Sequence, residues 1–97
     1  MGLRISGKNV DIGQALRTRI DEAVTGSVSK YFDGGYSGHV TVTKSGIQFE
    51  TDMALHLDTG VVFEVRGLAA DAHLSVEQAA ERLDKRLRRY KRRLKDH

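Results

Sequence analysis

One long amphipathic segment, from Val76 to Lys95, places the strongest constraint on how this chain can fold. Its apolar residues are spaced alternately four and three positions apart, which keeps them on one face of an α-helix. They are Val76, Ala80, Leu83, Leu87, Tyr90 and Leu94. A helix with such a face must bury it against another element, so we expect it to pack on the apolar side of a sheet.

The other faces of this helix are basic from Arg82 onward. From Arg82 to Lys95 the helix holds nine lysines and arginines, against Asp84 as the single acid in that span. At about 100° per residue, one row of basic residues lies beside the apolar stripe, and a second row lies on the side of the helix opposite the stripe. The first row is Arg82, Arg86, Arg89 and Arg93, and the second is Lys85, Arg88 and Arg92.

Like charges one turn apart repel each other, so this helix is less stable alone than one with alternating charges. Two or three cations would suffice to complement the dipole at the helix C-terminus. The positive charges beyond this number favour a polyanionic partner, and nucleic acid is the first candidate. An anionic membrane surface and an acidic protein stay open as alternatives.

The rest of the chain predicts a helix and four strands. Leu3–Ser6 alternates as a strand, and Asp11 with Gln14 has the spacing of a capping box for a helix that runs to Phe32. The glycines of Asp33-Gly34-Gly35 are expected to end that helix in the left-handed conformation. Three further strands are predicted at His39–Lys44, Ile47–Leu57 and Val61–Arg66, and Asp71 or Ser75 is expected to cap the last helix.

This order predicts an α+β two-layer sandwich, β-α-β-β-β-α, with a four-stranded mixed sheet and both helices on one face. The first two strands should be parallel because a helix joins them. Strand alternation gives the sheet one dry face and one wet face. Ile47, Phe49, Met53, Leu55 and Leu57 are predicted to point inward, and Glu50, Asp52 and Glu64 outward. A wet face with acids and no aromatic residue is a poor platform for stacking bases, so the helical side is the better nucleic-acid surface.

The composition limits the other functions. The 97 residues predict one domain, with a net charge of +3 and no cysteine. The four histidines lack metal-ligand spacing, no nucleophile has a partner base, and no phosphate loop occurs. We therefore expect no catalysis, metal, cofactor or small-molecule substrate. The segment Met1–Val10 lacks the apolar run of a signal peptide, and no stretch is long enough to span a membrane, so a cytoplasmic location is expected.

Several motifs resemble one bacterial family. The opening ISGKNVDIGQALR, the KYFD that closes the first helix, MALHLDTG in the third strand and the ending RLDKRLRRYKRRLKDH are similar to the ribosome hibernation promoting factors, which include the ribosome-associated translation inhibitor. One departure is His73, which stands where the family has a tyrosine at the start of the last helix.

The resemblance implies a fold similar to double-stranded RNA-binding domains, and binding to small-subunit rRNA between head and body. There the domain would occupy the space of messenger RNA and tRNA and inhibit translation in idle ribosomes. RNA-binding residues expected from the family positions and the charge pattern are Arg17, Lys30, Arg82, Lys85, Arg86, Arg89, Lys91, Arg92, Arg93 and Lys95.

Two questions stay open from the sequence. Family members are short forms or long forms that add a second domain, and the chain ends where either a short form or the N-terminal domain of a long form would end. Ribosome dimerisation is therefore expected only if a C-terminal domain follows residues 1–97. The alternative function is a non-ribosomal nucleic-acid-binding or sigma-factor-modulating module.

Overall fold

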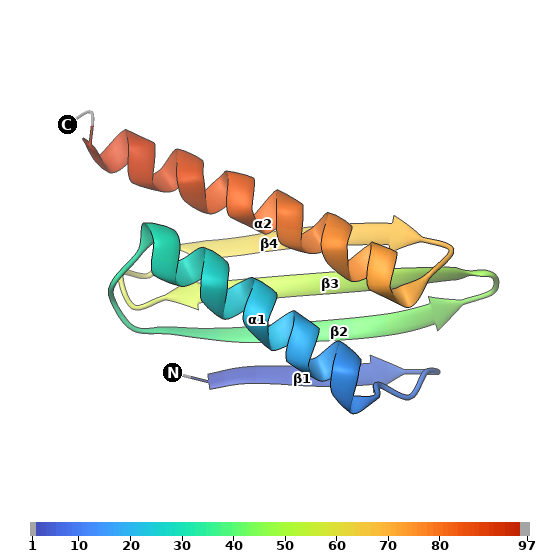
Figure 1. Ribbon diagram of the computed structural model, residues 1–97. Coiled ribbons are helices and arrows are strands. Elements are labelled where there is room, and N and C mark those ends of the chain that lie inside the picture. The colour runs from blue at the N-terminus through green and yellow to red at the C-terminus, as the bar shows by residue number, and fades with distance from the viewer. Residues whose placement is uncertain (1, 96–97) are drawn as a thin grey trace.

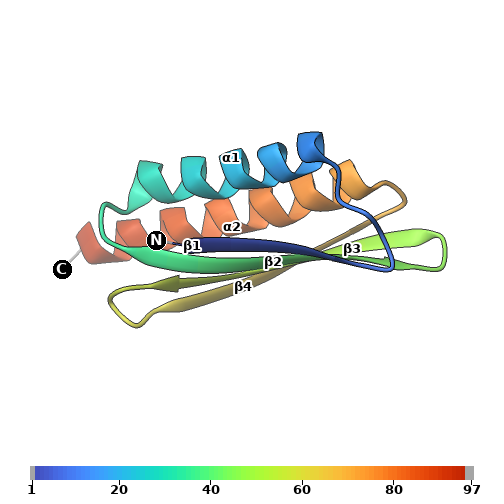
Figure 2. The same cartoon turned by 90° about the horizontal axis from the view of Figure 1, so that it is seen from below.

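Alternating strands and two amphipathic helices assemble into two layers in the computed structural model, which describes residues 2–95. The elements are β1 (Gly2–Lys8), α1 (Gln14–Tyr31), β2 (Tyr36–Ser45), β3 (Gln48–Leu57), β4 (Val62–Ala69) and α2 (Ala72–Lys95). The sheet order is β1-β2-β3-β4, with β1 parallel to β2 and the other pairs antiparallel. Both helices cover the same face of the sheet (Figures 1 and 2). The predicted fold class and element order are confirmed.

The core lies between the helices and the sheet, and the alternation of the strands explains it. Val40 and Val42 of β2, and Met53 and Leu55 of β3, are buried beneath the helices. Val76, Ala79, Leu83 and Leu87 close the core from α2, and Leu16, Ile20, Val24 and Val28 close it from α1. Leu94, which the sequence placed on the same stripe, is 57% exposed. The last turn of α2 extends past the core, so the stripe has nothing to cover there (Figure 1).

The predicted cap of the first helix is wrong. The N-cap residue is Gly13, without a side-chain hydrogen bond, and the helix starts at Gln14. The chain has no regular secondary structure from Asp11 to Gly13 and brings Ile12 against the core, so the helix begins too late for Asp11 to cap it. At α2 the cap is Asp71, whose carboxylate accepts hydrogen bonds from the backbone N–H groups of His73 and Leu74.

The predicted end of the first helix is also wrong in its geometry. The helix ends at Tyr31, and the next residue, Phe32, is extended rather than left-handed. The glycines are needed for space instead, because a Cβ on Gly34 would lie 2.7 Å from the Phe32 ring. The loop is held by Asp58, which accepts a 2.8 Å hydrogen bond from the Gly35 N–H and donates its own N–H to the Gly35 carbonyl.

Ile47 was predicted to point into the core, and the structure corrects this. Ser45 pairs with Gln48, which leaves Gly46 and Ile47 as a two-residue hairpin turn. Gly46 supplies the positive φ of 63° that such a turn needs at its first position. Ile47 is consequently 87% exposed, although it continues the apolar alternation of β3.

A buried pair of hydroxyl groups joins α2 to the sheet. Ser75, the alternative cap in the sequence analysis, is fully buried and its hydroxyl donates to the Ala72 carbonyl over 2.8 Å. The Thr51 hydroxyl lies 2.7 Å from it and therefore donates to the Ser75 oxygen. Both polar groups are satisfied, so they fix the position of the first turn of α2 at little cost.

Gly67 allows α2 to approach β4, and we predict that Gly67→Ala destabilises the fold. An added Cβ would overlap the Ser75 carbonyl oxygen and lie 2.8 Å from the Ala79 nitrogen. The backbones would have to separate, at a cost of about 1–3 kcal/mol of unfolding free energy. The matched control is Gly26→Ala in α1, where an added Cβ meets nothing within 4 Å. Urea denaturation should show this control unchanged or stabilised by about 0.5–1 kcal/mol; equal effects would contradict the packing.

Candidate nucleic-acid interface

Three side chains on α2, one helical turn apart, bind the free edge of β4. The Leu68 N–H donates to Gln78 Oε1 over 3.1 Å, Arg82 donates to the Arg66 carbonyl, and Arg86 donates to the Glu64 carbonyl over 3.0 Å. Four residues of helix rise about 6 Å and two residues of strand about 6.6 Å, so the two spacings match. The edge of β4 is thereby covered by α2, which protects it from pairing with another strand.

This edge contact positions two of the predicted RNA-binding residues. Arg82 and Arg86 are exposed, and the structure fixes each guanidinium through one N–H group to a strand carbonyl. A guanidinium has five N–H donors, so each can still bind a phosphate. The row Arg82, Arg86, Arg89 and Arg93 shares one side of α2, as the helical periodicity predicted, and the structure shows that this side faces β4.

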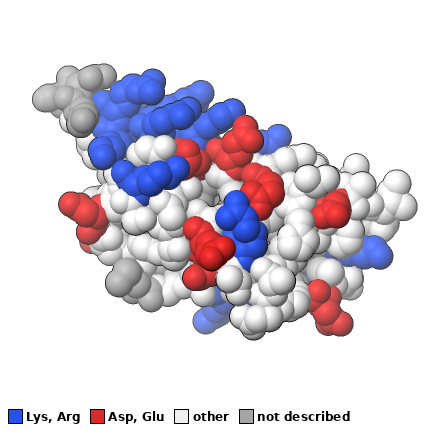
Figure 3. All heavy atoms as spheres, viewed as in Figure 1, with Lys and Arg blue, Asp and Glu red and all other residues white. Residues whose placement is uncertain are grey.

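The last turns of α2 carry arginines without structural partners. Within residues 2–95, no hydrogen bond or ion pair holds the side chains of Arg88, Arg89, Arg92 or Arg93, and all four are exposed. Figure 3 shows lysines and arginines gathered over this end of α2. We call these four residues the arginine cluster. Arg88 was counted in the charge pattern but omitted from the predicted binding residues. Its exposure could have been deduced from its position opposite the apolar stripe.

The other predicted residues are more scattered or already engaged. Lys85 pairs with Glu81 one turn earlier, at 3.3 Å. Lys91 reaches the Lys30 carbonyl of α1 at 3.5 Å, which places both near the arginine cluster. Arg17 donates to the Ile5 carbonyl of β1 and lies near the other end of the helical layer. Lys95 is in α2, but its side chain lies outside the described residues.

Asp84, the one acid in the basic segment, links the two helices. It accepts hydrogen bonds from the hydroxyl groups of Ser27 at 3.0 Å and Tyr31 at 3.1 Å, and it forms an ion pair with Lys30 at 2.8 Å. Desolvation, the largest single effect, raises the pKa of Asp84, but the hydrogen bonds from Lys30, Ser27 and Tyr31 together lower this pKa below its ordinary value. Lys30 therefore has a structural role in addition to any contact with RNA.

A second link between the helices is the ion pair of Arg19 with Glu77. Two guanidinium nitrogens donate to the two carboxylate oxygens at 2.5 and 2.6 Å. These hydrogen bonds lower the pKa of Glu77, although desolvation opposes them. The pairing neutralises the start of α2, so the positive charge of the helical layer is concentrated at its far end.

We predict that acid weakens the contact between the helices. The pKa of Asp84 is lower in the folded than in the unfolded chain, so its stabilisation is fully present above the unfolded-state value of about 4 and is lost as the pH falls through the folded-state value. Asp84→Asn should therefore unfold at lower urea concentration than the unchanged protein at neutral pH, and this difference should shrink below about pH 4. The exposed Asp33→Asn is the control. A pH-independent difference would contradict the assignment.

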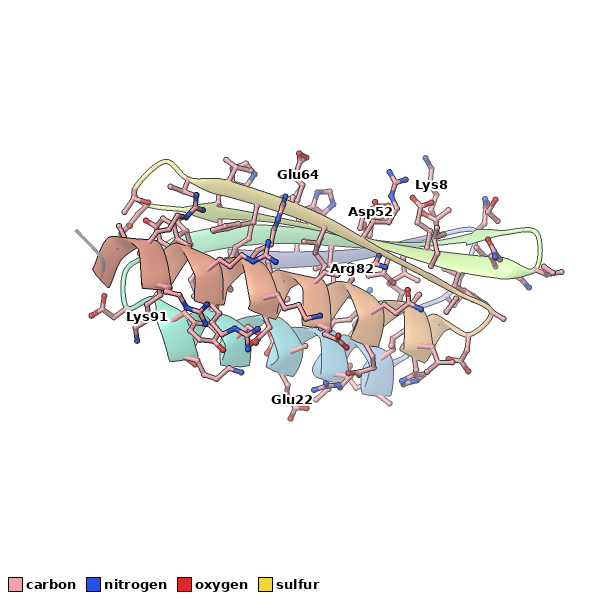
Figure 4. The ribbon with its side chains drawn as sticks, turned by 90° about the horizontal axis from the view of Figure 1, so that it is seen from above. Lys8, Glu22, Asp52, Glu64, Arg82 and Lys91 are labelled. Atoms are coloured by element: carbon pink, nitrogen blue, oxygen red, sulfur yellow. The ribbon has the colours of Figure 1, made fainter. Side chains whose placement is uncertain are left out.

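The face of the sheet opposite the helices is open and carries the predicted acids. Arg66 lies 3.0 Å from Asp52 and 3.5 Å from Glu50, which reduces the net charge there. Figure 4 shows Asp52 and Glu64 projecting away from the helices. In the described part of the chain, the alternation of the strands brings no phenylalanine or tyrosine side chain to this face. The surface carries acids and lacks these larger aromatic rings, so the helical layer is the better nucleic-acid surface.

Among residues 2–95, no group of three histidine, cysteine or acidic side chains is arranged to hold a metal ion. The same residues contain no helix with the length and apolar character needed to cross a membrane.

The fold and the arginine cluster define a small α+β sandwich domain with a strongly basic surface at one end of its helical layer. The chain belongs to the sigma 54 modulation protein / S30EA ribosomal protein family, whose model matches residues 3–95. It is 55% identical over its whole length to the ribosome hibernation promotion factor of Rhizobium meliloti, and 53% identical over 99% of its length to that of Bradyrhizobium diazoefficiens. It spans 51% and 47% of these two relatives.

Solved structures support the fold. The N-terminal domain of Thermus thermophilus Protein Y matches 93% of this chain and 99% of its own with a TM-score of 0.84 at 22% identity. A ribosomal subunit interface protein from Coxiella burnetii matches 94% of this chain and 98% of its own with a TM-score of 0.80 at 19% identity. The family resemblance expected from the motifs is confirmed.

Proposed function

We propose that this chain is a ribosome-binding domain that silences idle ribosomes. The arginine cluster is the observation that carries the proposal, because four exposed guanidinium groups without partners in residues 2–95 suit the phosphates of folded RNA. The curated relatives, about twice the length of this chain, are named ribosome hibernation promotion factors, and this supports the choice of the ribosome as the partner.

The proposed mechanism is occlusion. The basic end of the helical layer binds small-subunit rRNA between head and body, and the domain then fills the channel of messenger RNA and tRNA. Its residues 1–97 form the binding unit, it works in the cytoplasm, and it performs no catalysis. Pairing of ribosomes into dimers would require a further domain of the kind that long family members possess.

Cosedimentation with vacant small subunits tests the proposal. The protein should move with the subunits at moderate salt, and prior loading of messenger RNA and tRNA should prevent this, because both occupy the same space. Binding to unrelated RNA duplexes with no binding to subunits would contradict the proposal. Equal binding to empty and loaded subunits would contradict occlusion.

The family description also supports a second candidate, a modulator of sigma 54. Its partner would be a protein, so capture of that partner from a lysate should survive ribonuclease digestion. A ribosomal partner should be lost after the same treatment. This comparison separates the two candidates because only one of them depends on RNA.

We predict that reversing the charge of the open sheet face does not weaken ribosome binding. Lysine at positions Glu50, Asp52 and Glu64 should leave the affinity unchanged or raise it. Asp52 and Glu64 project away from the helical layer (Figure 4), and Glu50 shares the ion pairing of Asp52 with Arg66 on the same face. Filter binding to small subunits measures the effect, with thermal unfolding as the check on folding. A large loss of affinity would place the sheet in the interface.

A further inference from the structure

A groove opens where α2 separates from the start of β4. It has a volume of about 570 Å³ and is lined by Val61, Val62 and Phe63 at the start of β4 and by Arg86, Arg89, Arg92 and Arg93 on the helix. Figure 1 shows the end of α2 diverging from β4 at this point. The volume falls within the range of roughly 300–1,000 Å³ that is usual for sites of small organic groups.

The strand side of the groove presents an unused peptide edge. The Leu57 N–H donates to the Val61 carbonyl. In this antiparallel pair the backbone N–H and C=O groups of the odd-numbered residues of β4 therefore bond to β3, and those of the even-numbered residues point to the free edge of the sheet. The outward groups of Glu64, Arg66 and Leu68 are bound by α2. The Val62 N–H and carbonyl come next in this series, and within the described chain no side chain of α2 bonds to them.

The helix side of the groove presents positive charge. Of the described residues that line it, none is acidic and four are arginines. Three of these, Arg89, Arg92 and Arg93, belong to the arginine cluster and have no partner within residues 2–95. A planar guanidinium can bind a phosphate or stack on a base.

We propose that this groove binds one unpaired nucleotide of RNA, with its base against the Val62 edge and its phosphate between Arg89 and Arg93. The proposal rests on the proposed function for the identity of the polymer. A base edge carries both donors and acceptors, which match an adjacent N–H and carbonyl, and the apolar strand side suits the base rather than a phosphate alone. An added peptide strand fits less well, because it would find a single free residue on an edge that α2 otherwise covers.

The test compares a short single-stranded RNA with a ribose-phosphate chain of the same length that lacks bases. The unchanged protein should bind the complete RNA about tenfold more tightly, since the base contact adds to the phosphate contacts that both polymers make. Val62→Pro should lose most of this ratio because it removes a partner of the base. Arg93→Ala should also lose most of it, because the base reaches the Val62 edge only while the adjoining phosphate is held in the groove. Proline is tolerated at the first residue of an edge strand and removes the N–H in question.

Arg88→Ala is the matched control, because Arg88 belongs to the arginine cluster but does not line the groove. It should weaken both polymers equally and keep their ratio. Thermal unfolding checks each variant, and Arg93→Ala decides the matter if Val62→Pro fails to fold. Equal affinity of the unchanged protein for the two polymers, or an equal loss of the ratio in Arg88→Ala and Arg93→Ala, would overturn the inference.

Cosedimentation of the same proteins separates this inference from the proposed function. If the unchanged protein binds small subunits but does not distinguish the two polymers, the groove inference falls and the proposed function stands. If it distinguishes them but does not bind small subunits, the ribosomal function falls and the groove remains a nucleotide site. If an extended peptide displaces the RNA, and the base-free chain displaces it equally well, the groove binds a protein partner and the inference is wrong.

Discussion

Replacing Leu87 by alanine is expected to lower the free energy of unfolding by about 2–5 kcal/mol. The Leu87 side chain is 0% exposed and belongs to the core cluster beneath α2. Removing its methyl groups leaves a cavity that the rigid two-layer packing cannot close, so the cost includes both lost burial and lost contacts. Domains of this kind have about 5–15 kcal/mol of stability in total, so a large part of it depends on this one residue.

Urea denaturation measures this effect, and the neighbouring residue provides the control. Arg88 is exposed and has no described partner, so Arg88→Ala should stay within about 0.5 kcal/mol of the unchanged protein. The folded fraction of Leu87→Ala should bind small subunits with an unchanged dependence on salt. A Leu87→Ala protein that folds normally and loses binding would mean that the helix faces the other way.

Replacing all four residues of the arginine cluster by alanine should give the largest loss of RNA affinity. Each arginine that contacts a phosphate releases counterions, and binding then weakens with salt by a slope of about 0.7–0.9 per contact. Losing four contacts should flatten the slope of log affinity against log salt by about 3 and reduce affinity on the order of a hundredfold or more at moderate salt. The single change Arg89→Ala should account for about one contact.

Titration of small subunits at several salt concentrations measures both quantities. Replacing Arg4 and Lys8, which lie on the open face of β1, also removes positive charge but should leave the slope unchanged. The two variants remove different numbers of charges, so the change in slope is divided by the number of charges removed in each. An equal change per charge in the two variants would show that binding depends on net charge and not on the arginine cluster.

The order of the elements, the fold class and the two faces of α2 were predictable from the sequence. Periodicity determines these features, because a residue on the wrong face of a helix or strand would expose apolar surface or bury a charge. The row from Arg82 to Arg93 follows from the same geometry. One of the two proposed caps of α2, Asp71, was also correct, since a capping residue acts on backbone groups two or three positions away.

The errors lie where local patterns competed with packing. Ile47 continues the alternation of β3, yet the pairing of Ser45 with Gln48 places it in the turn. Asp11 has capping-box spacing, yet the path from β1 to α1 delays the start of the helix to Gln14. In both cases a register or a connection between distant elements overrode a signal of a few residues.

The arrangement of the basic side chains on the surface was decided by tertiary structure. The sequence counts nine basic residues on the last helix, but only the packed sheet shows that Arg82 and Arg86 are fixed to β4, that Lys30 is paired with Asp84, and that the arginine cluster lies past these contacts. The helix or strand repeat in the sequence predicts which face each residue lies on. A hydrogen bond between two elements depends on the distance between their backbones, which varies along their length. Gly67 sets that approach between α2 and β4, and the groove opens where the two separate.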